Sequence, residues 1–465
     1  MSAAESLPAS VITLKPRHAL PFFKHHPWVF AGAIRSVQGD PQPGDEVVLH
    51  THEGEFIARG LFNPHSQIRV RLYSWDQAEP LDQKFWKARL QSAFQLRDTL
   101  FRRAEGRQPN GTRFVSGTAL AAGNSPDNVD PESPVASAIP LKLSAIGRQP
   151  PDDSWHVRGL TPAGSPEITA YRLVNSEADG LSGLTVDRYD RWLSVQFTSL
   201  AIALRQEMLI ELLVELAQPA GIVLKTEKGL REAEGMEITD GLLWGEPPPK
   251  PLTVVEHGLK WEVDLTEGQK TGGYLDQRDN RRALARYVHG HRVLDVFCYT
   301  GGFGLGALVW GGASEVVAVD SSEAALQLAQ RNAELNGVAD RWRCLRSDGF
   351  KALETLRDAG EQFDTVVLDP PKLTRTRSAL PQALRAYHSL NRLAVSVLKP
   401  GGLLVTCSCS GLVTRDDFEQ MLADVAIQSG RDLRIIEVRG AAPDHPVSPF
   451  CPENEYLKCY VCHVT

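Results

Sequence analysis

The stretch VLDVFCYTGGFG, residues 293–304, decides the fold of this chain. Its apolar beginning predicts a strand with Asp295 near its end, and the glycines that follow predict a tight turn that opens a helix. Glycine at such a turn lets a ligand approach the backbone closely. The next predicted strand ends in Asp320, nineteen residues after Gly301. A carboxylate there can accept hydrogen bonds from both hydroxyls of a ribose, so the stretch predicts an α/β sheet that binds a ribose-containing ligand.

The sequence after about residue 250 continues this pattern to its end. Predicted strands at 292–297, 315–320, 341–348, 365–371 and 401–409 are separated by predicted helices. Such alternation is typical of a parallel sheet covered by helices, and the fold class is therefore α/β and Rossmann-like. Two further predicted strands, 433–440 and 455–465, have no helix between them, so we expect them to pair in an antiparallel manner.

Two kinds of cofactor fit the glycine-rich turn. The run from Gly302 matches G-x-G-x-x-A, which predicts a dinucleotide-dependent oxidoreductase as one alternative. Three features favour S-adenosylmethionine (SAM): Asp295 precedes the glycines where it could bind the amino group of a methionine moiety, TVVLDPP fills the fourth strand, and the sheet ends in an antiparallel pair. Asp348 ends the third strand, beside the expected adenine. Together, these features resemble the class I SAM-dependent methyltransferase fold. A turn that binds no ligand is the structural alternative.

A second motif, Asp369-Pro370-Pro371-Lys372, follows the fourth predicted strand. The prolines fix the backbone and present Asp369 at the carboxyl edge of the sheet, where ligands bind in open α/β sheets. In methyltransferases that act on planar nitrogens or on bases, this position faces the target base. An ordinary turn that ends a strand is the alternative interpretation.

Two cysteines end the fifth predicted strand, in GGLLVTCSCS, residues 401–410. A thiolate that adds to carbon 6 of a pyrimidine makes carbon 5 nucleophilic, so a cysteine here indicates covalent catalysis of methyl transfer to carbon 5. Side chains alternate along a strand, so Cys407 and Cys409 share one face unless the strand breaks between them. Two buried structural thiols are the remaining alternative.

The N-terminal residues differ from the rest of the chain in charge. The chain of 465 residues has a net charge of −7, yet residues 6–39 and 56–75 contain no Asp or Glu. Four short strands, punctuated by Gly and Pro, are predicted in the first 75 residues, at 10–14, 46–51, 55–62 and 68–75. This basic all-β module is a candidate nucleic-acid interface, and a solvated basic face is the alternative. The candidate RNA-binding residues are Lys15, Arg17, Lys24, Arg35, Arg69 and Arg71.

Composition excludes several classes of protein. With 42% hydrophobic and 23% charged residues, the chain is not disordered throughout, and no apolar run is long enough to span a membrane. The seven cysteines are an odd number, and the first residues do not resemble a secretory signal. We therefore expect reduced thiols and a cytoplasmic location.

The middle of the chain is less regular. A helix is predicted at 83–103 and another at 200–217, with strands between and after them. Of the 62 residues at 105–166, 26 are Gly, Pro, Ser or Asn, which predicts a long surface insertion of unknown function. The prolines at 247–251 mark a boundary. We therefore divide the chain into a small all-β domain (1–76), a middle α+β domain (77–250) and a C-terminal domain (251–465).

The chain resembles the bacterial large-subunit rRNA cytosine-5 methyltransferase family. The resemblance covers nearly the whole chain and rests on YLDQRDNR (274–281), LDVFCYTGGFG (294–304), LDPPKL (368–373), TCSCSG (406–411) and DHP (444–446). It implies that the N-terminal domain is a PUA domain, which binds RNA, and that the C-terminal domain is the class I methyltransferase. It also implies large-subunit rRNA as partner, and a homodimer is possible.

The resemblance assigns roles to particular residues. It makes Cys409, rather than Cys407, the nucleophile, with Asp369 orienting the base and Lys372 beside it in the catalytic set. It implies a SAM site formed by Asp295, Phe297, Tyr299, Gly301, Gly302, Asp320 and Asp348, together with Gln277 and Arg278. These last two lie in the segment 267–282, which is either a lid over the SAM pocket or a solvated helix start. No metal is expected.

The sequence departs from the family in two places. The insertion at 105–166 has no counterpart that we expect, and Lys372 stands where the two-cysteine branch of RNA cytosine-5 enzymes carries a cysteine. The base that removes the carbon 5 proton is therefore unidentified.

Other functions stay open from the sequence alone. They are an rRNA methyltransferase that modifies another atom, such as guanine N7, without a thiol, and an RNA-binding protein with an inactive methyltransferase domain. The C-x-x-C-H pattern at 459–463 is typical of haem attachment. It falls in a predicted strand, where residues three apart point to opposite faces, so we expect neither haem nor zinc there.

Overall fold

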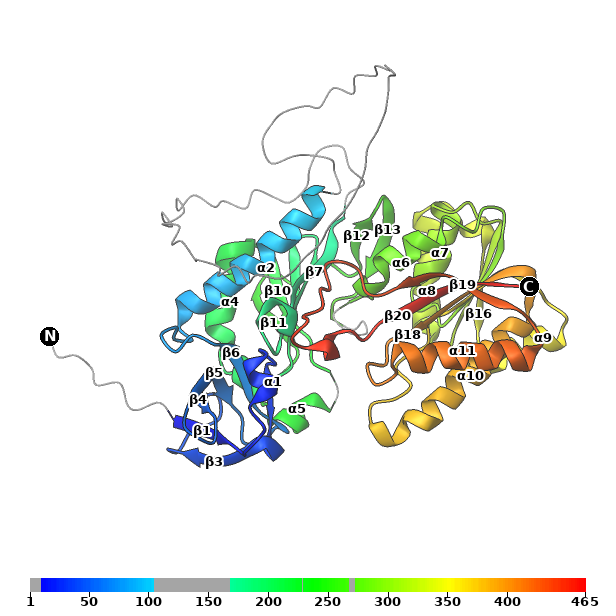
Figure 1. Cartoon of the computed structure of the whole chain (residues 1–465). Coiled ribbons are helices and arrows are strands. Elements are labelled where there is room, and N and C mark those ends of the chain that lie inside the picture. Colours follow the sequence, from blue (N-terminus) through cyan, green and yellow to red (C-terminus); the bar gives the residue numbers. More distant parts are fainter. Residues whose placement is uncertain (1–9, 104–167, 228, 267–271) are drawn as a thin grey trace, which may run out of the picture.

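The computed structural model describes residues 10–103, 168–227, 229–266 and 272–465. The predicted insertion at 105–166 and part of the predicted lid, residues 267–271, lie outside the described residues. Figure 1 shows three parts: a blue N-terminal part, a middle part in cyan to green, and a larger C-terminal part that ends in red. None of the described helices is long and apolar enough to cross a membrane.

The N-terminal part is a six-stranded sheet with the order β2-β6-β5-β4-β1-β3. Its elements are β1 (Ser10–Leu14), α1 (Leu20–Phe23), β2 (Trp28–Phe30), β3 (Ile34–Gln38), β4 (Glu46–His50), β5 (Phe56–Phe62) and β6 (Ile68–Ser74). Four of the strands are predicted from apolar runs. The prediction misses β2, which has three residues, and β3, which is an edge strand with mostly exposed side chains.

The middle part is a five-stranded sheet, order β11-β10-β9-β8-β7, packed against helices. The elements are α2 (Gln83–Arg103), β7 (Ala170–Asn175), β8 (Leu184–Tyr189), β9 (Trp192–Phe197), α3 (Leu200–Ala203), α4 (Gln206–Ala217), β10 (Gly221–Leu224), α5 (Leu230–Glu234) and β11 (Gly241–Gly245). The helix expected at 200–217 breaks at residues 204 and 205. There the Arg205 guanidinium donates to the Gly44 carbonyl of the N-terminal part, 2.9 Å away.

The C-terminal part confirms the predicted α/β class. A hairpin, β12 (Leu252–Glu256) and β13 (Leu259–Val263), precedes a seven-stranded sheet with the order β16-β15-β14-β17-β18-β20-β19. The strands are β14 (Arg292–Val296), β15 (Glu315–Asp320), β16 (Trp342–Arg346), β17 (Phe363–Leu368), β18 (Leu398–Ser408), β19 (Leu433–Arg439) and β20 (Lys458–Val464). Strands β14 to β18 pair in parallel, which confirms the parallel sheet, and β19 and β20 pair antiparallel, as expected. Strand β20 also pairs antiparallel with β18, which was not predicted.

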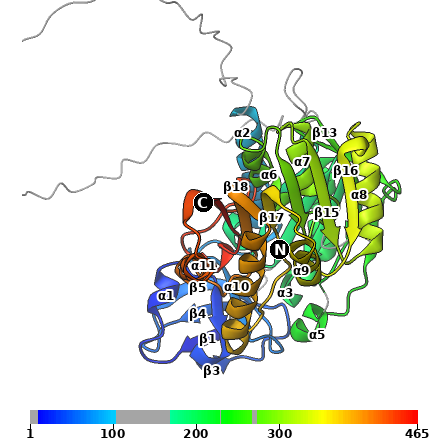
Figure 2. The same cartoon turned by 90° about the vertical axis from the view of Figure 1, so that its right-hand side faces the viewer.

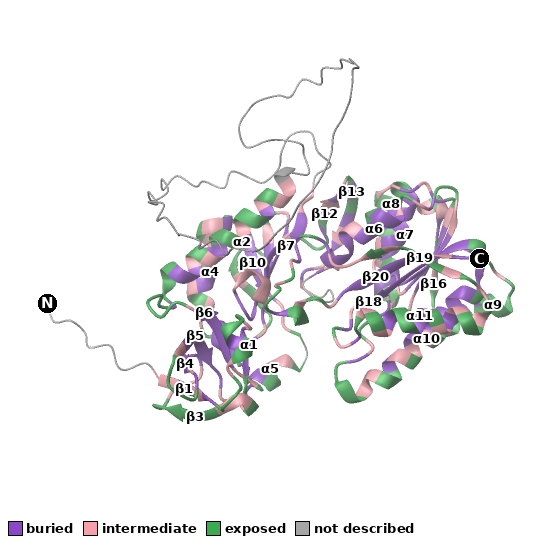
Figure 3. Cartoon of the chain, in the orientation of Figure 1, coloured by how far each residue is buried: buried purple, intermediate pink, exposed green. Residues whose placement is uncertain are grey.

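Helices cover both faces of this sheet (Figure 2). They are α6 (Arg278–Leu284), α7 (Gly302–Val309), α8 (Glu323–Leu335), α9 (Gly349–Asp358), α10 (Leu380–Ser396) and α11 (Arg415–Ser429). The first three bury apolar side chains on one face, and the last three do so on the other. Figure 3 shows the result, buried strands between helices with exposed outer faces. Short 3-10 helices include η2 (Ser176–Asp179) and η3 (Leu275–Gln277).

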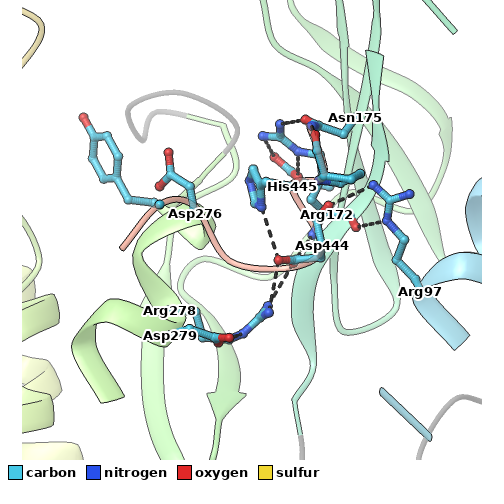
Figure 4. Close-up of polar contacts among 12 residues, drawn as sticks. Arg97, Arg172, Asn175, Asp276, Arg278, Asp279, Asp444 and His445 are labelled. Carbon is cyan, nitrogen blue, oxygen red and sulfur yellow. Dashed lines mark hydrogen bonds and ion pairs between the residues drawn. The ribbon is translucent and has the colours of Figure 1, made fainter. Parts of the chain in front are cut away.

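Buried polar contacts join the three parts. Arg71 on β6 lies 3.3 Å from Glu177 on η2 and 3.8 Å from Glu234 on α5, and all three side chains are under a tenth exposed. On the other side of the middle part, Asp444 accepts hydrogen bonds from Arg278 at 2.9 and 3.0 Å and from the Arg172 amide at 2.9 Å (Figure 4). These contacts hold the C-terminal part against the middle sheet.

Candidate active site

Asp295 on β14 lies at the centre of the site. It is 1% exposed, and its Oδ2 accepts a hydrogen bond of 2.8 Å from the Gly304 amide. Its Oδ1 has no hydrogen-bond partner among the described residues. Burial, together with the charges of Asp369 and Asp320, raises the pKa of Asp295 to about 7, although the Gly304 amide opposes this rise. A buried carboxylate oxygen without a partner can bind a cationic group.

The glycine-rich turn brings backbone into the same space. Phe297 and Tyr299 have φ values of 65° and 51°, a left-handed conformation that costs energy outside glycine and that clusters at functional sites. Gly301 has a φ of 93°, and a Cβ there would lie 2.9 Å from the ring of Trp342. A Cβ at Gly349 would collide with the ring of Phe297. The turn therefore needs glycine at these positions, because its backbone packs too closely against the two rings to leave room for a side chain.

Two more predicted cofactor residues border this turn. Asp320, half-buried at the end of β15, accepts hydrogen bonds from the amides of Tyr299 at 3.0 Å and Ser322 at 2.9 Å. Asp348 is exposed, and its Oδ1 caps α9 by accepting from the Phe350 amide at 3.0 Å. Both carboxylates thus lie at adjacent strand ends, where the sequence pattern predicts them.

Asp369 and Gln277 meet across the sheet edge. The Gln277 amide nitrogen donates to Asp369 Oδ1 at 3.0 Å, and its oxygen accepts from Asn280 at 2.6 Å. Gln277 is 2% exposed, so its role in this structure is to orient Asp369. Lys372, three residues after Asp369, is exposed.

The strand break separates the two candidate cysteines. Strand β18 ends at Ser408, so Cys407 lies within it and is fully buried, where burial and the neighbouring Cys459 raise its thiol pKa well above the usual range. Cys409 follows the break and is half-buried, with its Sγ 3.9 Å from the carbonyl of Pro370 in the Asp-Pro-Pro turn. Both thiols lie within electrostatic range of Asp369 or its turn, but only Cys409 is partly exposed and lies outside the apolar core.

Sequence reasoning missed several side chains near Cys409. Tyr274 packs edge-to-face on Tyr299, with ring centroids 5.3 Å apart. Tyr387 on α10 contacts the hydroxyls of Ser408 and Ser410 at 3.0 and 3.2 Å, and burial raises its pKa to about 12. Lys458, the first residue of β20, is 2% exposed. A lysine inside the apolar run of the last strand is a signal that could have found it, because buried lysines are rare.

Arg278 does not face the cofactor space. Its guanidinium is 4% exposed and pairs with both oxygens of Asp444, and this pairing lowers the pKa of the Asp444 carboxyl. We therefore leave Arg278 out of the SAM site, because its donors are already paired with Asp444, which in turn accepts from the Arg172 amide of the middle part.

The candidate RNA-binding residues divide in the same way. Lys15, Arg17, Lys24 and Arg35 are exposed on the N-terminal part, whereas Arg69 is half-buried and donates to the Pro64 carbonyl. Arg71 is 6% exposed and held by Glu177 and Glu234, so it cannot reach a phosphate in this structure. Charge counted along the sequence does not distinguish an exposed arginine from one that pairs inside the protein.

Two groups of potential metal ligands differ in their geometry. Cys459 and Cys462 pack into cores on opposite faces of the sheet, which confirms that the C-x-x-C-H pattern does not bring both thiols together. Elsewhere, His26, Cys451 and Glu453 lie close to one another. His26 Nδ1 accepts from the Trp28 amide at 3.2 Å, so the proton of a neutral ring is on Nε2, which faces Glu453 at 3.4 Å. A protonated ring nitrogen cannot ligate a metal.

Comparisons with known proteins agree with this fold. Two solved structures have a TM-score of 0.72 and 17% identity, covering 97% of this chain and 99% of each of theirs. One is described as a SAM-dependent methyltransferase from Streptococcus mutans, and the other as a methyltransferase complexed with SAH. At this identity, the likeness shows the fold alone.

Sequence families give a closer placement. The S-adenosylmethionine-dependent methyltransferase family matches residues 236–451, and the PUA-like domain family matches residues 12–75. Relatives from Escherichia coli O157:H7 and Shigella dysenteriae serotype 1, both named ribosomal RNA large subunit methyltransferase I, are 39% and 38% identical over 442 residues. Each match covers 95% of this chain, with 96% and 95% of the relatives. The chain therefore belongs to the family of SAM-dependent methyltransferases with an N-terminal PUA-like domain whose curated members are named ribosomal RNA large subunit methyltransferase I.

Proposed function

We propose that this enzyme forms 5-methylcytosine in large-subunit ribosomal RNA, with Cys409 as the covalent nucleophile. The relatives' name supports the RNA substrate. The observation that carries the choice of atom is the half-buried Cys409 thiol, which lies 3.9 Å from the Pro370 carbonyl in the turn that holds Asp369. Methyl transfer to a ring nitrogen such as guanine N7 needs no thiol, and therefore gives no reason for a thiol at this place.

The residues around Asp295 fit SAM. Its unpartnered Oδ1 would bind the cofactor's ammonium group, and the backbone of the turn at Gly301 and Gly302 would approach the methionine moiety. Asp320 would accept from the ribose hydroxyls, and Asp348 would lie beside the adenine. When bound, SAM supplies an electrophilic methyl group. Tyr299 and Phe297 would border the cofactor from the strained turn.

The chain's own groups would activate the cytosine. The Cys409 thiolate forms a bond to carbon 6, and the electron pair of the 5,6 double bond then attacks the methyl carbon from carbon 5. Asp369 in its protonated form, oriented by Gln277, would donate a hydrogen bond to ring nitrogen 3, which has no hydrogen of its own, and so help the ring accept charge as sulfur adds. Loss of the carbon 5 proton to a base then restores the double bond, and the bond between carbon 6 and sulfur breaks.

The N-terminal part would bind the sugar-phosphate backbone of the RNA. Lys15, Arg17, Lys24 and Arg35 are exposed cations on one small domain, suited to phosphate contacts without base recognition. The target cytosine must be unpaired or leave its stack to reach the thiol. Such an enzyme would act in the cytoplasm, where ribosomal RNA is assembled. A measurement of its molecular mass in solution would show whether it acts as a homodimer.

The decisive test is methyl transfer from labelled SAM to unmodified large-subunit rRNA, with nucleoside analysis of the product. We expect 5-methylcytosine from the wild type, and a loss of at least about 10³-fold with Cys409→Ala, since the nucleophile is removed. Cys344→Ser is the matched control, because Cys344 is also half-buried but lies on β16. SAM binding by Cys409→Ala checks that the variant is folded.

Two outcomes would overturn the proposal. One is another methylated nucleoside, and the other is full turnover by Cys409→Ala. RNA that carries 5-fluorocytidine offers a direct check, because fluorine cannot leave as a proton does. We expect it to trap the enzyme on the RNA through Cys409, as a covalent complex that survives denaturation.

A further inference from the structure

Lys458 lies beside the segment that carries Cys409. It is the first residue of β20 and pairs in register with Ser408, the last residue of β18. Its Nζ donates to the carbonyls of Ser410 at 2.8 Å and Val413 at 2.7 Å. These two carbonyls belong to the turn that follows Cys409, so a single ammonium group ties this turn to the sheet.

We propose that Lys458 is a positioning residue for the nucleophile: its ammonium fixes the turn that presents Cys409, and its positive charge favours the thiolate over the thiol. This inference rests on the proposed function in one respect only, namely that the Cys409 thiolate is the reacting group. The contacts that support it are independent of RNA and of SAM.

The surroundings of Cys409 explain why a cation is needed. Asp369 directly precedes Pro370, whose carbonyl is near the thiol, and in the enzyme without RNA an ionised Asp369 would oppose ionisation of sulfur. Tyr274, Tyr387 and Tyr456 are within electrostatic range of Cys409 and have pKa values raised by burial, so they are neutral at physiological pH. Of these four groups, the ionised one is the Asp369 carboxylate, and it opposes formation of the thiolate.

The groups that face Lys458 leave its charge available to the thiol. Burial lowers the pKa of Lys458 to about 8, and Cys409 is the largest influence in the opposite direction. Arg415 at the start of α11 lowers the lysine pKa, and Glu455 and Asp417 raise it. Arg415 and Glu455 pair with each other at 2.6 Å, and Asp417 caps α11 through Thr414. Charges interact more strongly in such a poorly hydrated setting than in water.

The test measures the Cys409 thiol itself. Its alkylation by iodoacetamide is followed from pH 6 to 10 without RNA or SAM, and the Cys409 peptide is quantified by mass spectrometry. Lys458→Met removes both charge and hydrogen bonds, whereas Lys458→Gln keeps a donor for a carbonyl but has no charge. Lys399→Met is the matched control, because Lys399 lies on β18 and pairs with Asp364 at 2.8 Å, at the start of that strand.

We expect both Lys458 variants to raise the apparent thiol pKa by about one unit, which lowers alkylation at pH 7 about tenfold but leaves the rate at high pH unchanged. The control should match the wild type. An unchanged pKa in Lys458→Gln would overturn the role of the charge. Should neither variant fold, the wild type decides: a Cys409 pKa at or above about 8.5, the value of a free thiol, would refute the inference.

Failure of the proposed function would look different. If Cys409→Ala retained methylation, the nucleophile would be wrong even with a lysine-dependent thiol pKa. If methylation required Cys409 but the pKa of the Cys409 thiol did not change in the Lys458 variants, only the inference about Lys458 would fail. The pH profile of turnover separates the two further, because a merely structural lysine would lower turnover at every pH rather than shift its acid limb.

Discussion

Binding of SAM should depend on pH through Asp295. The carboxyl is 1% exposed, its Oδ1 lacks a partner among the described residues, and its pKa is raised to about 7. In the free enzyme, Asp295 is then ionised in about 3% of molecules at pH 5.5 and in about three quarters at pH 7.5. An ammonium group beside the carboxylate favours the ionised form, so binding must release the proton at low pH.

The size of the effect follows from these fractions. The Kd of SAM should weaken about 25-fold from pH 7.5 to pH 5.5, which corresponds to about 1.9 kcal/mol. Above pH of about 8, the α-amino group of SAM loses its own proton, so affinity should be greatest near pH 7.5. Close to one proton should be released per SAM bound at pH 6, since about nine in ten carboxyls are protonated before binding.

Isothermal titration calorimetry in two buffers of different ionisation enthalpy measures both quantities. Asp295→Asn keeps an acceptor for the Gly304 amide but carries no charge, so its weaker binding should not change across this range. Methylthioadenosine, which lacks the amino-acid part, should bind the wild type without the pH dependence. The reasoning is refuted if the wild-type Kd is constant from pH 5.5 to 7.5, or if Asp295→Asn keeps the slope.

Three further predictions concern the buried Arg278–Asp444 ion pair, the RNA interface and the glycine-rich turn. Asp444→Asn should lower the free energy of unfolding in urea by about 3–5 kcal/mol because it leaves the buried Arg278 guanidinium uncompensated, and adding Arg278→Met should recover part of this loss. Since Arg278 depresses the pKa of Asp444, the stabilisation should be complete above the usual aspartate pKa and decline as the pH falls below it; equal stability at pH 7 and pH 3 would contradict this. Lys15→Glu with Arg17→Glu should weaken RNA binding and reduce its salt slope by about one for each phosphate that these side chains neutralise in the wild type, and an unchanged slope in filter binding would remove these residues from the interface. Gly301→Ala should weaken SAM binding at least tenfold without unfolding the enzyme, because φ is 93° and a Cβ there would meet a tryptophan ring and shift the turn; wild-type affinity in calorimetry would count against a role of this turn in SAM binding.

The fold was accessible from sequence because its decisive residues follow strand ends. Parallel strands bring their carboxyl ends to one edge, so Asp295, Asp320 and Asp369 had to lie near one another once the strands were recognised. The structure places all three there. The element types follow from local periodicity, which is why the long helix α2 agrees with the prediction to the residue. The hairpin of β12 and β13 was not predicted, because its strands are short and follow a proline-rich segment.

The roles of arginines were not accessible in this way. Arg71 stands in a basic run, and Arg278 in the segment that opens the methyltransferase domain, yet each pairs with an acid more than a hundred residues away in sequence. A cation paired inside the protein and one exposed to RNA have the same local sequence signature. Only the tertiary structure shows which carboxylate each arginine meets, and for both residues that partner makes the side chain structural.

The two cysteines show where the sequence and the structure had to be combined. Alternation along the strand puts Cys407 and Cys409 on one face, and by that rule alone neither could be preferred. The end of β18 at Ser408 breaks the rule: Cys407 stays in the core, and Cys409 turns toward Pro370. Lys458 supplies a reason for the turn to hold its shape, since its ammonium binds two carbonyls beyond Cys409. Two features of the tertiary structure therefore make this thiol a candidate nucleophile: the strand ends just before Cys409, and the Lys458 ammonium binds the turn that follows it.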